Sequence, residues 1–495
     1  MTHQDFDAPS TLSLFGGVRR RPDTGGDGAF APTVFEGPKV RADRTTLADM
    51  HARVGKYDLA APPVILPDFH HKRKMETPSS VAVATLESIR PTLTSSSVNC
   101  GMALIALDCD RPDEKAIADF YRGVVERYPY PPTRRLELTS KEVAAAATEG
   151  AQFAVDKYGV DPAQLDRVEE GGRIDLEQYG GGARFLKELP SLALHFARLR
   201  FGTVGPSNHF VELQTVEEIL DEEAAALLGV QRGQLTLQFH GGGGMLTSEI
   251  GRIFGRRLDY PRDVRAAMKV LKPWYHLATA RSLEQLRERL ALYFSDGFPP
   301  VRRESAEGQR LMLANAAAAN YGFAFRMATY SALQQLAVQA FGGSPGRLVV
   351  DSPHNSVYEE DVNGVSAVVH RHNSCRAFPA EMMPPGTTFA TTGQALLLPG
   401  THRTSSYLAT AGPNAAASLY TACHGAGTVI DTFAERGWSG RDPLHRGTLE
   451  FGYQGAAPKV VDHLDDNGVN AALDVLVRNG LVKPVARMRP MAVLH

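Results

Sequence analysis

The sequence predicts an α/β (α+β) protein built as one large domain. Short apolar runs, typical of buried strands, alternate with longer stretches that have the 3.6-residue period of helices. No internal repeat or linker is evident after residue 45, and candidate functional motifs are spread over 68–495. A site gathered from such distant segments needs a common scaffold, so we expect a single domain over 46–495. Residues 1–45 are rich in Gly, Pro, Asp and Arg, which favours a loosely ordered arm.

The elements follow from local patterns. The expected strands are the apolar runs at 63–66, 81–84, 102–107, 235–239, 365–369 and 395–398. The expected helices are 112–128, one from Thr139 with Glu142 in capping-box spacing, and one from Ser282 with Gln285 in the same role. An Ala-rich pattern predicts a long helix over 308–341, with Gly322 as the candidate position for a kink. A last helix is expected over 468–478, ending before Asn479-Gly480.

Composition narrows the class of protein. The chain has 43% hydrophobic and 22% charged residues, which is ordinary for a soluble globular protein. Its formal net charge is −2, so any nucleic acid would have to be recognised by a local basic patch. Four cysteines are too few for a disulfide scaffold, and neither a signal-peptide pattern nor an 18-residue apolar run is present. We therefore expect a cytoplasmic protein with free thiols and no membrane partner.

A histidine before a small-residue turn suggests phosphate chemistry. His424 directly precedes Gly425, Ala426 and Gly427, and small residues let a backbone approach an anion closely. A neutral imidazole nitrogen can attack phosphorus and form a covalent intermediate. The motif alone is weak, because a buried histidine beside a tight turn would have the same sequence.

Four potential metal ligands stand beside apolar runs. They are Cys100, His209, His240 and His354. A thiolate with imidazoles suits a divalent transition metal, and ligand softness alone favours Zn²⁺ before Mn²⁺ or Fe²⁺. The alternative is a set of unrelated polar residues that cap strands or bond in the core. The four glycines after His240 could cradle a phosphate or form a flexible loop.

Nine segments, in this order, resemble motifs of the RtcB family of RNA-splicing ligases over residues 60–495. They are Pro67-Asp68-Phe69-His70, Ser97–Gly101, Asn208–Glu212, His240 with its glycines, His354-Asn355, His370–Pro379, Pro399–Tyr407, Cys423–Gly427 and Val485–Pro490.

The resemblance implies mixed sheets around a central metal-binding cleft and a GTP- and Mn²⁺-dependent RNA ligase. Such an enzyme joins 2′,3′-cyclic phosphate or 3′-phosphate ends to 5′-hydroxyl ends, in tRNA splicing or RNA repair, through guanylate on the position of His424. Whether an activating protein is needed is left open. By motif, the metal ligands are Cys100, His209, His240, His354 and the position of Ser97. The guanylate contacts are Asn208, Glu212, Ser406, Gly425, Ala426, Gly427 and His495.

The chain departs from the family pattern at the presumed site. The family's aspartate is Ser97, which leaves open whether one or two metals bind, and the C-terminal lysine is His495. The arginine after Gly-Ala-Gly is Thr428, and segment 71–78 is charged instead of glycine-rich. In that segment, Lys72 and Lys74 are candidate phosphate contacts, and Glu76 is a candidate replacement metal ligand. Two alternatives therefore remain: a guanylyltransferase that caps 3′-phosphate ends without sealing, and a non-catalytic RNA-end binding protein.

Overall fold

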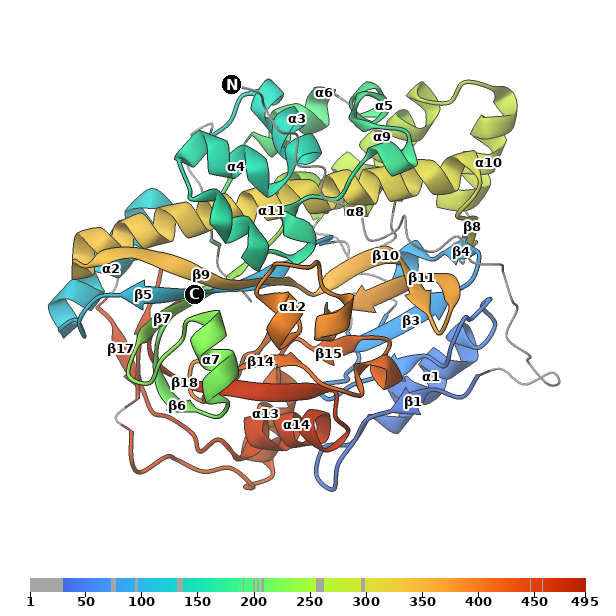
Figure 1. Cartoon of the computed structure of the whole chain (residues 1–495). Coiled ribbons are helices and arrows are strands. Elements are labelled where there is room, and N and C mark those ends of the chain that lie inside the picture. The colour runs from blue at the N-terminus through green and yellow to red at the C-terminus, as the bar shows by residue number, and fades with distance from the viewer. Residues whose placement is uncertain are drawn as a thin grey trace.

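The computed structural model describes residues 30–495, except 73–76, 94–96, 131–136, 190, 199–200, 203, 206–208, 255–261, 295–298, 446 and 456. It is a mixed α/β structure, as the sequence predicts. A layer of helices lies over a nine-stranded sheet, and a five-stranded sheet lies beside that sheet (Figure 1). In the part of the chain described here, no helix is long and apolar enough to cross a membrane.

The nine-stranded sheet forms the centre of the domain. Its strands are β13 (Ala395–Leu398), β14 (Ser406–Ala411), β18 (Val482–Leu494), β6 (Phe210–Ile219), β7 (Leu235–Gly241), β5 (Gly101–Asp108) and β9 (Ser344–Pro353) in spatial order, with β16 (Thr448–Phe451) and β17 (Lys459–Val461) attached through β18. Neighbours along the main path are antiparallel. All of β7 and nearly all of β5 is buried; β5 appears as a continuous apolar run, whereas β7 alternates apolar residues with Thr236, Gln238 and His240.

Three smaller sheets complete the described β-structure, and one of them positions His424. The five-stranded sheet has the order β1 (Thr33–Val34), β2 (Val64–Ile65), β3 (Val81–Thr85), β11 (Val365–His372) and β10 (Asn355–Val362). Two strand pairs complete the β-structure: β12 (Ser374–Arg376) with β15 (Thr421–Cys423), and β4 (Ser88–Ile89) with β8 (Val301–Arg302). The β12–β15 pair sets the position of His424, which follows β15 directly.

Helices cover the central sheet, and the longest, α11 (Ala306–Phe341), lies across the middle of the helical layer (Figure 1). The other α-helices are α1 (Arg44–Val54), α2 (Glu114–Arg127), α3 (Ser140–Glu149), α4 (Ala151–Tyr158), α5 (Gly182–Glu188), α6 (Ser191–Ala197), α7 (Glu222–Leu228), α8 (Gly244–Phe254), α9 (Arg262–Ala278), α10 (Leu283–Phe294), α12 (Phe389–Thr392), α13 (Gly427–Glu435) and α14 (Asn467–Arg478). Apolar side chains of α2, α3, α4 and α8 share one core with α11.

The six expected strands and the expected helices are present, with differences in detail. At α3, Thr139 and Glu142 form both bonds of a capping box. At α10, Ser282 accepts from the Gln285 backbone, but the Gln285 side chain accepts from the backbone of Arg281 instead of Ser282. α14 ends at Arg478, directly before Asn479, as expected.

Gly322 does not break α11, which is continuous over 36 residues. A Cβ on Gly322 would lie 2.9 Å from Oδ1 of Asn99. The glycine therefore permits a close approach between α11 and the segment that precedes β5, rather than a kink.

The expectation of a loose arm does not hold for the described part of 1–45. Residues 1–29 lie outside the described residues. From residue 30 the chain is packed: β1 pairs in parallel with β2, and Phe35 and Val40 are buried. Backbone bonds from Thr33 to Pro63 and from Phe35 to Ile65 hold this segment. Composition does not reveal such pairing, because backbone groups make it.

Candidate metal centre

Three adjacent strands bring Cys100, His209 and His240 together. Cys100 precedes β5, His209 precedes β6, and His240 lies near the end of β7, between the other two strands. The Cys100 Sγ is 3.2 Å from Nε2 of His240 and 3.9 Å from Nε2 of His209. One ligand atom from each residue lies within 4.8 Å of the others. A sulfur and two imidazoles fit a divalent transition metal.

Burial sets the protonation of these groups. It raises the pKa of the Cys100 thiol, while the Arg326 guanidinium and a hydrogen bond from Ser97 act in the opposite direction. Burial also lowers the pKa of His209 to about 4, so this imidazole is neutral at neutral pH. Because metal binds the thiolate, loading the site would release the thiol proton. The hydrogen bond from Ser97 places its side chain beside the Cys100 thiol.

A buried arginine on α11 supports the cysteine, and no sequence pattern predicts this role. Arg326 is fully buried; its Nε lies 2.9 Å from Oδ1 of Asp351, and its Nη2 donates to Oδ1 of Asn99 at 2.6 Å. It also donates to the backbone oxygen of Asn99. Asn99 has φ of 57°, in the left-handed region that side chains rarely adopt. Arg326 thus holds a strained residue directly before Cys100.

His354 lies between the metal group and His424. It joins β9 to β10, and its backbone N–H donates to the Cys100 oxygen at 2.8 Å. Its ring centroid is 5.0 Å from that of His240 and 4.3 Å from that of His424. Its Nδ1 is buried and has no hydrogen-bond partner among the described residues. The family resemblance places His354 among the metal ligands, and its ring lies beside that of His240. The ligand atoms that all lie within 4.8 Å of one another belong to Cys100, His209 and His240.

His424 is neutral, with one nitrogen engaged. Its Nδ1 is 2.9 Å from the backbone oxygen of Asn373, which can only accept, so Nδ1 carries the proton and Nε2 has the free lone pair. Burial and then the nearby Lys72 charge lower the pKa of His424 to about 3. Asn373 has φ of 49°, in the left-handed region. The geometry suits nucleophilic attack through Nε2.

The Gly425–Gly427 turn is open, but the helix end beside it is engaged. A Cβ at Gly427 would have no neighbour within 4 Å. α13 begins at Gly427, and its Thr428 N–H donates to Oδ1 of Asp68 at 2.7 Å. Burial raises the pKa of Asp68 to about 7. An anion at this helix end would therefore meet a carboxyl group that the sequence did not place there.

The other expected guanylate contacts among the described residues come from three strands or their ends. Glu212 is buried on β6, and burial raises its pKa to about 8. The Ser406 hydroxyl accepts from the Gly400 N–H at 3.1 Å. His495 lies with Nε2 3.5 Å from Oε1 of Glu450. Asn208, Lys74 and Glu76 lie outside the described residues.

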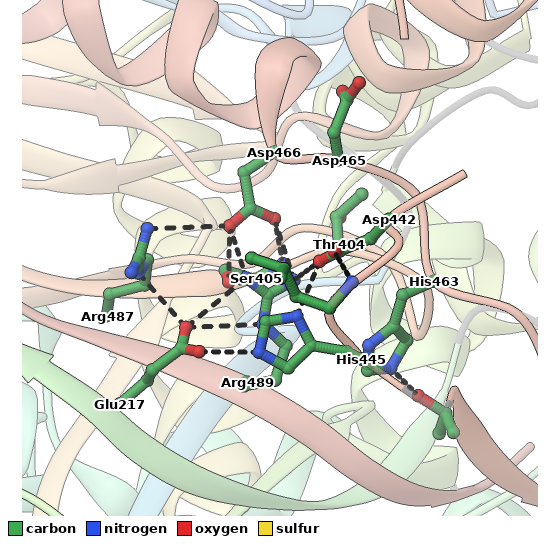
Figure 2. Close-up of polar contacts among 12 residues, drawn as sticks. Glu217, Thr404, Ser405, Asp442, His445, His463, Asp465, Asp466, Arg487 and Arg489 are labelled. Carbon is green, nitrogen blue, oxygen red and sulfur yellow. Dashed lines mark hydrogen bonds and ion pairs between the residues drawn. The ribbon is translucent and has the colours of Figure 1, made fainter. Parts of the chain in front are cut away.

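A network of charged side chains holds the loop that precedes β14 (Figure 2). Arg487 and Arg489, from the segment that resembles the C-terminal family motif, contact Glu217 and Asp466. Asp466 also accepts from both the backbone N–H and the hydroxyl of Ser405, at 2.8 Å each. The network therefore fixes the 399–406 loop, whose Pro399 oxygen accepts from the Ala426 N–H at 3.2 Å.

The site thus combines a Cys–His group that could hold a metal ion with a neutral histidine beside it, on mixed sheets. The family model described as "tRNA-splicing ligase RtcB" matches residues 54–495. The chain therefore belongs to the RtcB family.

Curated relatives share this assignment. The chain is 31% identical over 419 residues to the tRNA-splicing ligase RtcB of Pyrococcus furiosus, covering 80% of this chain and 39% of that protein. It is 28% identical to the protein of the same name in Thermococcus kodakarensis, over 92% of each chain. It is 29% identical to the RNA-splicing ligase RtcB of Mycobacterium tuberculosis, over 70% of this chain and 74% of that one. The match thus spans about two fifths of the Pyrococcus furiosus protein.

Proposed function

We propose that the protein is a GTP-dependent RNA ligase that joins 3′-phosphate or 2′,3′-cyclic phosphate ends to 5′-hydroxyl ends. The observation that carries this proposal is His424. Its Nε2 has a free lone pair, its pKa is lowered to about 3, and its ring centroid lies 4.3 Å from that of His354. The printed names of the relatives agree with RNA ligation.

The reaction would run in three transfers. Nε2 of His424 forms a bond to the α-phosphorus of GTP, and pyrophosphate leaves. An oxygen of the RNA 3′-phosphate then takes the guanylate from the histidine, and finally the 5′-hydroxyl attacks that phosphate, loses its proton and releases GMP. A 2′,3′-cyclic phosphate would first be opened by water to a 3′-phosphate. A covalent intermediate divides one difficult step into easier ones.

The donor set supports the proposal that the reaction needs a metal ion. Cys100, His209 and His240 would hold a divalent ion, for which we propose Mn²⁺, and its charge would offset that of the phosphates. Ser97 brings no negative charge, so we propose one metal rather than two. Lys72 would add a cation near the phosphate, since its charge already contributes to lowering the pKa of His424.

The test is RNA joining by the purified full chain with GTP and MnCl₂. The substrate is a labelled RNA with a 3′-phosphate and a second RNA with a 5′-hydroxyl. We expect a joined product from the wild type and from His51→Ala, which lies on α1, but none from His424→Ala. Guanylate-capped 3′ ends without joining would instead support the capping alternative, which the altered Ser97, Thr428 and His495 positions favour. RNA binding with neither a joined nor a capped product would contradict both the ligase and the guanylyltransferase hypotheses.

A further inference from the structure

The carboxylate of Asp466 connects the loop before β14 to the C-terminal part of the chain (Figure 2). Asp466 lies directly before α14 and is buried. Its Oδ1 accepts from the Ser405 backbone N–H and its Oδ2 from the Ser405 hydroxyl, both at 2.8 Å. Nη2 of Arg489 lies 3.0 Å from the same Oδ2. Both carboxylate oxygens are thus bonded within the protein, so Asp466 acts on the site only through its neighbours.

The loop that Asp466 holds is closed on itself beside Pro399. The Ser406 hydroxyl, one residue after the bonded Ser405, accepts from the Gly400 N–H at 3.1 Å. Gly400 follows Pro399 directly. Two hydrogen bonds and two peptide bonds therefore lead from Asp466 to Pro399.

Pro399 in turn contacts the turn that follows His424. Its backbone oxygen accepts from the Ala426 N–H at 3.2 Å. A Cβ on Gly425 would lie 3.8 Å from Cγ of Pro399. A shift of the loop therefore either moves this turn with it or leaves the Ala426 N–H without its acceptor, only two residues from the histidine.

The rest of the charged network makes the position of Asp466 rigid. Nη2 of Arg489 also lies 3.3 Å from Oε2 of Glu217, and its Nη1 lies 3.4 Å from Oδ2 of Asp442. His445 joins these two carboxylates, with Nδ1 2.6 Å from Asp442 and Nε2 2.8 Å from Glu217. The arginine keeps both of these partners if Asp466 is neutralised, so such a variant leaves no buried charge unpaired.

We propose that Asp466 is a positioning residue for His424, which it holds in place through Ser405, Pro399 and Ala426. The proposal rests on the proposed function, in which His424 attacks the α-phosphorus of GTP. Such an attack needs the reacting atoms at about 3–3.5 Å in the correct orientation, and a misplacement of about 1 Å costs on the order of 100-fold in rate. The effect of Asp466 should therefore appear in the rate of the covalent step at saturating GTP.

The test compares Asp466→Asn, Ser405→Ala and the double variant with the wild type. Asparagine keeps the shape of aspartate but replaces one acceptor oxygen by an amide donor, so one of the two bonds from Ser405 is lost. The matched control is Asp465→Asn, the same change at the neighbouring residue, whose carboxylate accepts from Ser439 and Gly440 instead of from the loop. Covalent labelling by GTP with MnCl₂ is followed in single turnovers, well below the melting temperature of each variant. The rate constant describes only those chains that take label.

We expect Asp466→Asn to lower the maximal labelling rate by about 10- to 100-fold. Ser405→Ala keeps the backbone bond to Asp466, so its rate should fall less. The double variant should be within about twofold of Asp466→Asn, since both changes interrupt the same path. Asp465→Asn should stay within about twofold of the wild type.

A purely structural role would lower the melting temperature of Asp466→Asn but leave its rate constant unchanged, and this result would overturn the proposal. An increase in KM alone, or an equal loss of rate in Asp465→Asn, would overturn it too. If Asp466→Asn does not fold, Ser405→Ala decides by the same criterion. Failure of the wild type to take label from GTP would instead contradict the proposed function, so the two failures are distinguishable.

Discussion

Replacing Arg326 by methionine should damage both the stability of the protein and its affinity for metal. The change removes the buried partner of Asp351, which is 4% exposed. It also removes both hydrogen bonds to Asn99, the residue with φ of 57° that precedes Cys100. Nothing else in the described structure replaces these bonds on Asn99, so Cys100 should lose its fixed position.

The expected size follows from these contacts. Removing one member of a buried ion pair costs about 3–5 kcal/mol, since the remaining charge stays buried without a partner. Loss of support behind a metal ligand lowers metal affinity by about 10- to 100-fold. Arg326→Met should therefore show both effects together.

The assay is denaturant unfolding of metal-free protein, followed by calorimetric titration with Mn²⁺. The matched control is Arg289→Met, which breaks the buried Arg289–Glu307 pair of the helical layer. We expect the control to lose up to about 3 kcal/mol, because Glu307 keeps Arg310 and Tyr293 as partners, and to keep its metal affinity. The reasoning is refuted if Arg326→Met binds Mn²⁺ as well as Arg289→Met does.

Three further changes have defined outcomes. Ser97→Asp should raise the Mn²⁺ stoichiometry from one to two in a calorimetric titration, because it adds a carboxylate beside the Cys100 thiol. Gly322→Ala should weaken Mn²⁺ binding, since its Cβ would lie 2.9 Å from Oδ1 of Asn99; the crowding costs about 1–3 kcal/mol, against about 1 kcal/mol gained in helix propensity. His370→Gln should flatten the pH dependence of unfolding between pH 7 and pH 5.

The sign of the His370 effect follows from its hydrogen bonds. Nε2 of His370 accepts the backbone N–H of Arg90, and burial lowers the pKa of this histidine to about 4. Below pH 6.5 the unfolded chain takes up a proton there, while the folded chain does so only near pH 4. The contribution of His370 to the free energy of unfolding is therefore fully present above pH 6.5. It is lost as the pH falls, by about 2 kcal/mol at pH 5. An equal loss of stability in His370→Gln would contradict this prediction. The other two predictions fail if Ser97→Asp leaves the Mn²⁺ stoichiometry unchanged or if Gly322→Ala leaves the Mn²⁺ affinity unchanged.

The fold was predictable where the apolar residues follow a clear pattern, continuous in β5 and alternating in β7. Strands β5 and β7 and the Ala-rich α11 are buried almost throughout, so hydrophobic patterning predicts them. Residues 30–45 were not predictable in this way, because β1 joins the sheet mainly through backbone hydrogen bonds.

In the candidate site, too, some features could be predicted from the sequence and others could not. Cys100, His209 and His240 meet because they stand at the ends of three neighbouring strands, but before the structure only the family resemblance indicated that these residues act together. Arg326 was not predictable, since an arginine in a helical pattern is usually solvated and only the structure reveals its buried partner. The Asp68 bond to Thr428 depends on a contact between residues 360 positions apart, which no local pattern encodes.

The most direct test of the account is to find the atom that carries the guanylate. The wild-type protein is incubated with GTP and Mn²⁺, digested under alkaline conditions, and the labelled peptide is sequenced by mass spectrometry, with the phosphoramidate isomer assigned by phosphorus NMR. We expect one guanylate per chain, on Nε2 of His424, because Nδ1 is held by the Asn373 oxygen. Label on another residue, or the same label in His424→Ala, would contradict it.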